Sequence, residues 1–298
     1  MLPNLLIAGA PRCGTTSLFH YLQKHPEISF PNLKEPRYFS SYRLSLPQRG
    51  PGDQSVDYKL ITRFDDYIKL YERLENTYVG DGSTTYLYQY AESIPEILQR
   101  LGQPHIILVL RNPVLRAYSA YYNLVRDGRE TENFGTAVEL EASRIASNYD
   151  MMWHLTSVSM YADSVHAYLQ AFASVKVILY DDLSNDPSAV LTEIAAFLGI
   201  SSFPKIRRAI QYSRGGVPRL KSTSGVIGRK SNKTFRFRLM LEQRIGRYAF
   251  EKIGNLLLKP HPEIKTYNYN KLLQVFTDDI NRLEEIISRD LSHWKKSA

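Results

Sequence analysis

The chain has 298 residues, 43% of them hydrophobic and 23% charged, which predicts a soluble globular protein large enough for one sizeable core. Its formal net charge of +8 points to polyanionic partners, such as nucleic acid, an anionic glycan or a highly charged nucleotide. The single cysteine, Cys13, excludes an intrachain disulfide; because neither a leader nor a membrane span of about 18 apolar residues is apparent, we expect a cytoplasmic protein.

Apolar runs alternate with helical patterns as far as residue 200. Strands are expected at Leu5–Ala8, Ile28–Phe30, the first part of 77–88, Ile106–Leu110 and Val175–Tyr180. Helices are expected after the loop at 9–14, after Pro113, at about 159–173, and from the Asp-Pro pair at 186–187 to a stop at Gly199. This alternation predicts a three-layer α/β fold with a central parallel sheet flanked by helices. In such sheets ligands bind at the carboxyl ends of the strands, where the polar motifs of this chain fall.

Two other regions differ in composition. Residues 40–62 are rich in Ser, Pro, Gly and Arg and predict a surface excursion, either a lid or an acceptor-binding loop. From Lys205 to Lys252 there are fourteen Lys or Arg and two acids, and from Leu272 to Ile287 apolar residues recur at the spacing of a packed helix. We expect one domain over 1–298, with a core at about 4–200 and a basic, mostly helical part at about 205–298.

The segment GAPRCGTT, residues 9–16, has the glycine spacing of a Walker A loop between a strand and a helix. Converging main-chain N–H groups and the helix N-terminus predict an anion site. Thr15 replaces the lysine that would span the phosphates of a nucleoside triphosphate, which argues against a nucleoside triphosphatase. We expect Arg12 to supply the positive charge, and Thr15 and Thr16 to donate hydroxyl hydrogen bonds to a smaller anionic group.

A second polar group follows the strand at 106–110. Arg111 stands at the end of this strand, and Ser119 lies eight residues later, two turns along the next helix. If the strand neighbours the first one, Arg111 lies beside the loop at 9–14. Arg111 and Ser119 could then bracket one phosphate, the arginine by a forked contact and the serine by its hydroxyl.

Taken together, GAPRCGTTSL and LRNPVLRAYSAYY resemble the phosphosulfate loop and the 3′-phosphate motif of sulfotransferases that use 3′-phosphoadenosine 5′-phosphosulfate (PAPS). KEPRYF at 34–39 and GDGSTTYL at 80–87 are similar to segments of the glycosaminoglycan (heparan sulfate type) and bacterial carbohydrate branch. VILYDDLSNDPSAVLTEIAAFLGI and LEEIISRDLSHW resemble the late strand and helix and the C-terminal helix of the family. The resemblance covers nearly the whole chain, and residues 9–18 carry its most specific motif.

The resemblance implies a P-loop-like enzyme that moves a sulfuryl group from PAPS to a hydroxyl, or an amine, of an acceptor. It implies release of 3′-phosphoadenosine 5′-phosphate and no required metal. The step is an in-line displacement in which Arg12 and the loop N–H groups neutralise the leaving phosphate. Glu35 matches the glutamate that serves as base, and Lys34 would hold the sulfuryl oxygens or tune Glu35.

The cofactor contacts that the resemblance implies come from several parts of the chain. They are Arg12, Cys13, Gly14, Thr15, Thr16, Ser17, Arg111, Ser119, Tyr180 and Arg219. Tyr180 is either a partner of the adenine face or a core tyrosine, and Arg219, in RGGVPR, helps to bind the 3′-phosphate. Cys13 is either a small residue in a small space or, if the helix N-terminus lowers the pKa of its thiol, a site of oxidation.

The expected acceptor is a saccharide or another hydroxylated small molecule, not nucleic acid. Gly82 stands where some glycosaminoglycan sulfotransferases have lysine, which favours an acceptor of low charge, whereas the basic segment 205–252 favours an anionic one. Two other classes stay open. A P-loop nucleotide kinase or other phosphotransferase would need magnesium and a triphosphate, and a non-enzymatic binder of anionic polymers would lose affinity steeply with salt.

Overall fold

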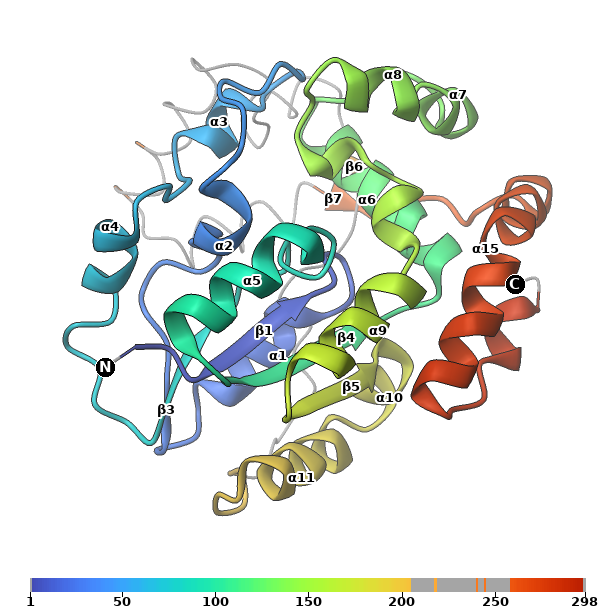
Figure 1. Cartoon of the computed structure of the whole chain (residues 1–298). Coiled ribbons are helices and arrows are strands. Elements are labelled where there is room, and N and C mark those ends of the chain that lie inside the picture. The colour runs from blue at the N-terminus through green and yellow to red at the C-terminus, as the bar shows by residue number, and fades with distance from the viewer. Residues whose placement is uncertain (1, 205–216, 219–239, 241–243, 245–257, 297–298) are drawn as a thin grey trace.

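The computed structural model describes residues 2–204, 217–218, 240, 244 and 258–296. At its centre is a sheet of five parallel strands in the order β2-β3-β1-β4-β5. The strands are β1 (Leu5–Gly9), β2 (Ile28–Ser29), β3 (Tyr78–Asp81), β4 (His105–Leu110) and β5 (Val175–Leu179). Figure 1 shows helices on both faces of this sheet, so the predicted three-layer α/β fold is confirmed.

The helices follow the strands in chain order. In the first half they are α1 (Thr15–Leu22), α2 (Tyr38–Ser41), α3 (Gln54–Asp57), α4 (Phe64–Lys69), α5 (Tyr90–Leu101), α6 (Pro113–Arg126), α7 (Phe134–Glu139) and α8 (Glu141–Ala146). Later come the 3₁₀ turns η1 (Met151–Trp153) and η2 (Ser157–Ser159), then α9 (Ala162–Ala171), α10 (Tyr180–Asn185), α11 (Pro187–Leu198), α15 (Thr266–Ile287) and η4 (Ser292–Lys295). A short antiparallel pair joins β6 (Val217–Pro218) to β7 (Leu258–Lys259). None of the described helices is long and apolar enough to cross a membrane.

The strands β1 and β4 determine where the polar loops lie. All of β1 and nearly all of β4 is buried, as expected for apolar runs covered on both faces by helices. The two strands are neighbours, and past their paired residues the N–H of Ala10 donates to the carbonyl of Val109 at 2.8 Å. The loop after β1 and Arg111 after β4 therefore leave the same edge of the sheet, as predicted.

Helix α11 begins and ends at the residues that the sequence predicts. The Asp186 carboxylate accepts hydrogen bonds from the N–H groups of Ser188 and Ala189, and Pro187 occupies the first turn. Gly199 ends the helix with φ 64°, a left-handed conformation that glycine adopts without strain. Several boundaries differ slightly from the prediction: β2 ends at Ser29 rather than Phe30, and β5 ends at Leu179, so that Tyr180 begins α10.

Residues 40–62, predicted to form a surface excursion, are anchored by one buried carboxylate. The fully buried Asp53 carboxylate accepts hydrogen bonds from the main-chain N–H groups of Gly50 and Asp150, from the Trp153 indole at 3.1 Å, and from Arg129. This carboxylate ties the segment to the region that follows α6. Charged residues are expected on surfaces, so the composition of the segment gave no sign of the buried ion pair.

The C-terminal helix α15 packs against α9 and α6. Its apolar stripe, including Phe276, Ile280 and Leu283, is buried as its spacing predicts. Most of the basic segment 205–252 lies outside the described residues. The single domain and the mostly helical basic part therefore stay predictions.

Candidate active site

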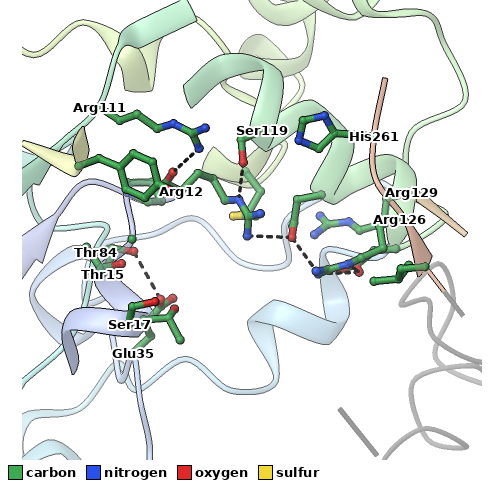
Figure 2. A pocket seen from close by; sticks show the side chains of 18 of the residues that line it. Arg12, Thr15, Ser17, Glu35, Thr84, Arg111, Ser119, Arg126, Arg129 and His261 are labelled. Carbon is green, nitrogen blue, oxygen red and sulfur yellow. Dashed lines mark hydrogen bonds and ion pairs between the residues drawn. The ribbon is translucent and has the colours of Figure 1, made fainter. Parts of the chain in front are cut away.

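A pocket of about 610 Å³ opens at the carboxyl ends of β1, β3 and β4. Figure 2 shows its two ends, with Glu35, Ser17 and Thr84 on one side and Arg126, Arg129 and His261 on the other. Of the residues predicted to form the site, those that line the pocket are Arg12, Gly14, Thr15, Thr16, Ser17, Glu35, Arg111, Ser119 and Tyr180. The topology thus brings four separate motifs of the sequence into one cavity.

The loop after β1 presents its main chain to the pocket. Gly14 has φ 85°, and a Cβ built there would lie 2.8 Å from the ring of Tyr180, so both conformation and space favour glycine. The first hydrogen bond of α1 runs from the N–H of Leu18 to the carbonyl of Gly14, at 3.1 Å. The N–H groups of residues 15–17 precede this bond and point out of the helix end, as in an anion-binding helix N-terminus.

Arg12 crosses the pocket and contacts α6. Its Nε donates to the Ser119 hydroxyl at 3.3 Å and its Nη1 to the Asn123 Oδ1 at 3.2 Å. Burial and the nearby Arg126 and Arg111 lower the pKa of the Arg12 guanidinium to about 10. Arg12 is still positively charged at neutral pH, and this crowding of like charges favours the entry of an anion.

Arg111 lies between the loop and Tyr180. Its Nη1 donates to the main-chain carbonyl of Arg12 at 3.3 Å, and its guanidinium carbon is 4.6 Å from the centre of the Tyr180 ring. The buried Nε of Arg111 has no hydrogen-bond partner in the part of the chain that the structure describes. A buried guanidinium donor without a partner is costly in a folded protein, so this group fits a phosphate or sulfate oxygen.

Among the described residues, Glu35 is the one acidic side chain at its end of the pocket. Its carboxylate pairs with Lys34 Nζ at 2.8 Å and Arg37 Nη2 at 3.1 Å, and it lies 3.5 Å from the Thr84 hydroxyl. Burial raises the pKa of the Glu35 carboxyl, but the positive charges of Lys34 and Arg37 outweigh it and bring the pKa to about 2. Glu35 is therefore ionised at neutral pH, as a general base must be, but its basicity is weakened by both partners.

The turn after β3 holds the Glu35 loop in place. The buried Asp81 carboxylate accepts hydrogen bonds from the hydroxyls of Ser83, Tyr67 and Tyr86 at 2.7 to 2.8 Å. Ser83 Oγ in turn accepts from the main-chain N–H of Arg37 at 3.0 Å. Asp81 does not line the pocket and acts through Ser83 on the backbone next to Glu35.

Gly82 leaves room for an aromatic ring. A Cβ at this position would lie 2.8 Å from the Phe19 ring, so a lysine there would have to displace Phe19. The Lys34 ammonium lies 5.8 Å from the centre of the same ring.

Cys13 is the one loop residue between Arg12 and Ser17 that does not line the pocket. Its side chain is fully buried, and its sulfur lies 3.7 Å from the Tyr161 hydroxyl. Burial raises the pKa of the thiol, so the expectation that the helix N-terminus lowers it is wrong. Any contact of Cys13 with a cofactor is left to its main chain. Arg219, also predicted to bind the cofactor, lies outside the described residues.

Several pocket residues were missed in the sequence. Asn123 and Arg126 follow Ser119 by four and seven residues on α6, so they share its helical face, and this spacing was a usable signal. Asn123 Oδ1 accepts hydrogen bonds from both Arg12, at 3.2 Å, and Arg126, at 2.8 Å. Arg129 and His261 complete this end of the pocket. Within the described ranges, no group of three or more His, Cys, Asp or Glu is placed to hold a metal ion.

Comparison with known proteins identifies the family. The family model described as "Sulfotransferase family" matches residues 3–205, and the chain belongs to this family. A crystal structure of a sulfotransferase from Alicyclobacillus acidocaldarius is 30% identical in sequence, covers 99% of this chain and 100% of that chain, and superposes with a TM-score of 0.77. The resemblance and the fold read from the sequence are thereby confirmed.

Two curated relatives match over shorter segments. The membrane-associated sulfotransferase kil1 of Dictyostelium discoideum is 31% identical over 121 residues, which are 41% of this chain and 23% of that protein. Carbohydrate sulfotransferase 15 of Homo sapiens is 26% identical over 184 residues, which are 49% of this chain and 31% of that protein. The match spans less than a third of the length of either relative.

Proposed function

We propose that the protein transfers a sulfuryl group from PAPS to a hydroxyl group of a saccharide. The observation that carries this proposal is the meeting of Arg12, from the phosphate-binding loop, with Ser119, from α6, in a pocket whose other end holds Glu35. A donor with phosphate groups at both its 5′ and 3′ positions needs two anion sites in one cavity. That the chain belongs to the sulfotransferase family supports this proposal.

The residues present fit such a donor. The N–H groups of residues 15–17 and the hydroxyls of Thr15 and Thr16 would bind the 5′-phosphosulfate. The partnerless Nε of Arg111 and the hydroxyl of Ser119 would bind the 3′-phosphate. Tyr180, whose ring already stacks with Arg111, would lie against the adenine.

The transfer is an in-line displacement at sulfur. The acceptor oxygen forms a bond to the sulfur, the bond from sulfur to the 5′-phosphate oxygen breaks, and the acceptor proton passes to Glu35. Negative charge grows on the leaving phosphate, where Arg12 and the loop N–H groups stabilise it. 3′-Phosphoadenosine 5′-phosphate leaves with the bonding electron pair.

The ion pairs of Glu35 link binding of the donor to the strength of the base. Lys34 and Arg37 hold the pKa of Glu35 to about 2, which disfavours proton uptake. A sulfuryl group in the pocket would compete with Glu35 for Lys34. Each contact of Lys34 with the donor would then raise the pKa of Glu35 and make it a better base at the moment the acceptor is attacked.

The charges around Glu35 favour an acceptor of low charge. Lys34 and Arg37 both pair with Glu35, and Arg37 also lies 3.7 Å from Asp150. Further along the pocket, Arg129 forms an ion pair with the buried Asp53. An anionic acceptor would have to compete with these carboxylates, whereas a neutral sugar hydroxyl would not. A saccharide also agrees with the name of the human relative, a carbohydrate sulfotransferase.

Thermal unfolding with added nucleotide tests the donor. At about 100 times its Kd, 3′-phosphoadenosine 5′-phosphate should stabilise the protein by about 2.7 kcal/mol, with no effect of magnesium. ATP with magnesium should stabilise it less. An equal or larger effect of ATP with magnesium would point instead to a phosphotransferase, and no effect of either nucleotide would contradict the proposal.

Turnover tests the base and the acceptor. With labelled PAPS, neutral oligosaccharides should be sulfated faster than sulfated or carboxylated ones of the same length. Glu35→Gln should abolish transfer while leaving stabilisation by the nucleotide in place. A Glu35→Gln variant with full activity would remove Glu35 from the role of base.

A further inference from the structure

Trp294, near the C-terminus, is 1% exposed and forms hydrogen bonds at both its side chain and its main chain. Its indole Nε1 donates to the Asp181 carboxylate at 2.9 Å. Its main-chain carbonyl accepts from Asn112 Nδ2 and from the Tyr269 hydroxyl, both at 3.1 Å. One residue of η4 is thus bonded to two separate elements of the α/β core.

The two elements are those that carry the stacked pair of the pocket. Asn112 directly follows Arg111, and Asp181 directly follows Tyr180. The Arg111 guanidinium and the Tyr180 ring lie 4.6 Å apart, and both line the pocket. Trp294 therefore links the side chain of Asn112, next to Arg111, to the side chain of Asp181, next to Tyr180.

Two further contacts hold the same place. Tyr269 of α15 accepts a hydrogen bond from Asn112 at 3.0 Å, so Asn112 is bonded twice to the C-terminal region. Arg289 pairs with Asp182 of α10 at 2.6 Å, at an exposed position where an ion pair contributes little on its own. The Trp294 indole bonds to the first turn of α10 with a buried donor, whereas both groups of the Arg289–Asp182 pair are exposed.

We propose that Trp294 is a positioning residue for the donor. It sets the spacing of Arg111 and Tyr180, and so the affinity for the 3′-phosphate and the adenine, without touching either. This inference rests on the proposed binding of PAPS at these two residues. It assigns to the C-terminal segment a role in donor binding rather than in the chemistry around Glu35.

The decisive variant is Trp294→Phe, which removes the indole N–H and keeps an aromatic ring and the main-chain carbonyl. The Kd for 3′-phosphoadenosine 5′-phosphate and the KM for PAPS should rise about threefold to tenfold, the size expected from loss of one ordinary hydrogen bond. At saturating PAPS, kcat and the KM for the acceptor should stay within twofold of wild type. A general loss of folding would not raise the KM for PAPS while leaving kcat and the KM for the acceptor unchanged.

Phe276→Leu is the matched control, because it also shrinks a fully buried aromatic side chain of the C-terminal region. Phe276 lies on α15 and should lower the midpoint of thermal unfolding without changing the KM for PAPS. Equal Kd values for wild type and Trp294→Phe would overturn the inference. A rise in the KM for PAPS of the Phe276→Leu control equal to that of Trp294→Phe would also overturn the inference.

Asp181→Ala provides a second approach if Trp294→Phe does not fold. The Asp181 side chain is 38% exposed, and its removal deletes the acceptor of the indole N–H together with a 3.4 Å contact to His293. It should raise the Kd for the nucleotide to a similar extent, and the double variant should be no weaker than either single one. If the losses of nucleotide affinity in the two single variants added up in the double variant, the inference would be overturned. If the wild-type protein itself fails to bind the nucleotide, it is the proposed function that fails.

Discussion

Arg12 and Ser119, 107 positions apart, share a hydrogen bond of 3.3 Å across the pocket. The arginine belongs to the loop after β1 and the serine to α6, so the bond joins the two halves of the anion site. In the proposed binding of PAPS, Arg12 would turn to the 5′-phosphate and Ser119 to the 3′-phosphate, and these contacts would replace the bond between the two side chains. Entry of the donor therefore exchanges one protein contact for two contacts with the ligand.

Two substitutions of Arg12 should distinguish the contribution of its positive charge from that of its forked hydrogen bonds. Arg12→Lys keeps a positive charge but loses the fork that reaches Ser119 and Asn123, so the KM for PAPS should rise about tenfold. Arg12→Ala should lower kcat/KM by at least a further tenfold, about 1.4 kcal/mol of transition-state stabilisation. Steady-state kinetics check both values.

The control for Arg12 is Arg63→Ala, which removes an arginine side chain that is 73% exposed. It should leave the kinetic constants unchanged. Activity of Arg12→Ala equal to that of Arg63→Ala would show that the loop does not depend on its arginine.

Glu35 should make folding stability depend on pH in the acid range. The pKa of Glu35 is about 2 in the folded protein against an ordinary value of 4.5, so between these values the unfolded chain binds more protons. The stabilisation from Glu35 is complete above pH 4.5 and is lost as the pH falls to about 2. Urea midpoints of wild type should fall more steeply over this range than those of Glu35→Gln. Parallel curves for the two proteins would contradict the ion pairs at Glu35.

Ser83→Ala should impair the chemistry and leave donor binding intact. The change removes the acceptor for the Arg37 N–H and one donor to Asp81, so the backbone next to Glu35 loses its support. We expect kcat to fall about tenfold with little change in the Kd for the nucleotide, because a misplaced base affects only the transition state. Ser29→Ala, which removes a buried hydroxyl without a partner among the described residues, is the control and should keep kcat.

Asp53→Asn should destabilise the protein strongly. It leaves the buried Arg129 without its counter-charge, which costs about 3–5 kcal/mol in comparable buried pairs. Asp66→Asn breaks an exposed pair with Lys69 and should cost less than about 1 kcal/mol. Urea unfolding measures both, and similar costs for the two variants would contradict the anchoring of residues 40–62 by Asp53.

The strands of the sheet and the placement of Arg111 beside the first loop could be predicted from the sequence, because both depend on local patterns and simple topology. The strands are short apolar runs, and α11 has its cap, its proline and its glycine at the expected places, so these elements depend on neighbouring residues only. Arg111 could be placed beside the first loop because parallel strands end at one edge of a sheet. Local patterns and simple topology were enough for these features.

Contacts between distant side chains were beyond such patterns. The turn of Arg12 toward α6 depends on Ser119 and Asn123, and the burial of Asp53 depends on Arg129, 76 positions away. Ser119 belongs to a motif, but neither a motif nor periodicity indicates that Arg12 turns toward Ser119 or that Arg129 pairs with Asp53. Nothing in the sequence around Trp294 indicates a link to Asp181, 113 positions away.

Arg12, Glu35 and Arg37 share a left-handed backbone conformation, with φ of 70°, 60° and 58°. Side chains with a Cβ adopt this region at a cost of about 1 kcal/mol or more, and glycine does not. Substitution of glycine at any of these positions would relieve the backbone and remove a charged group from the pocket or its rim. The ion pairs of Glu35 and Arg37 would be lost with their side chains, so the strained backbone persists at these positions because the charged groups stabilise both the folded protein and the site.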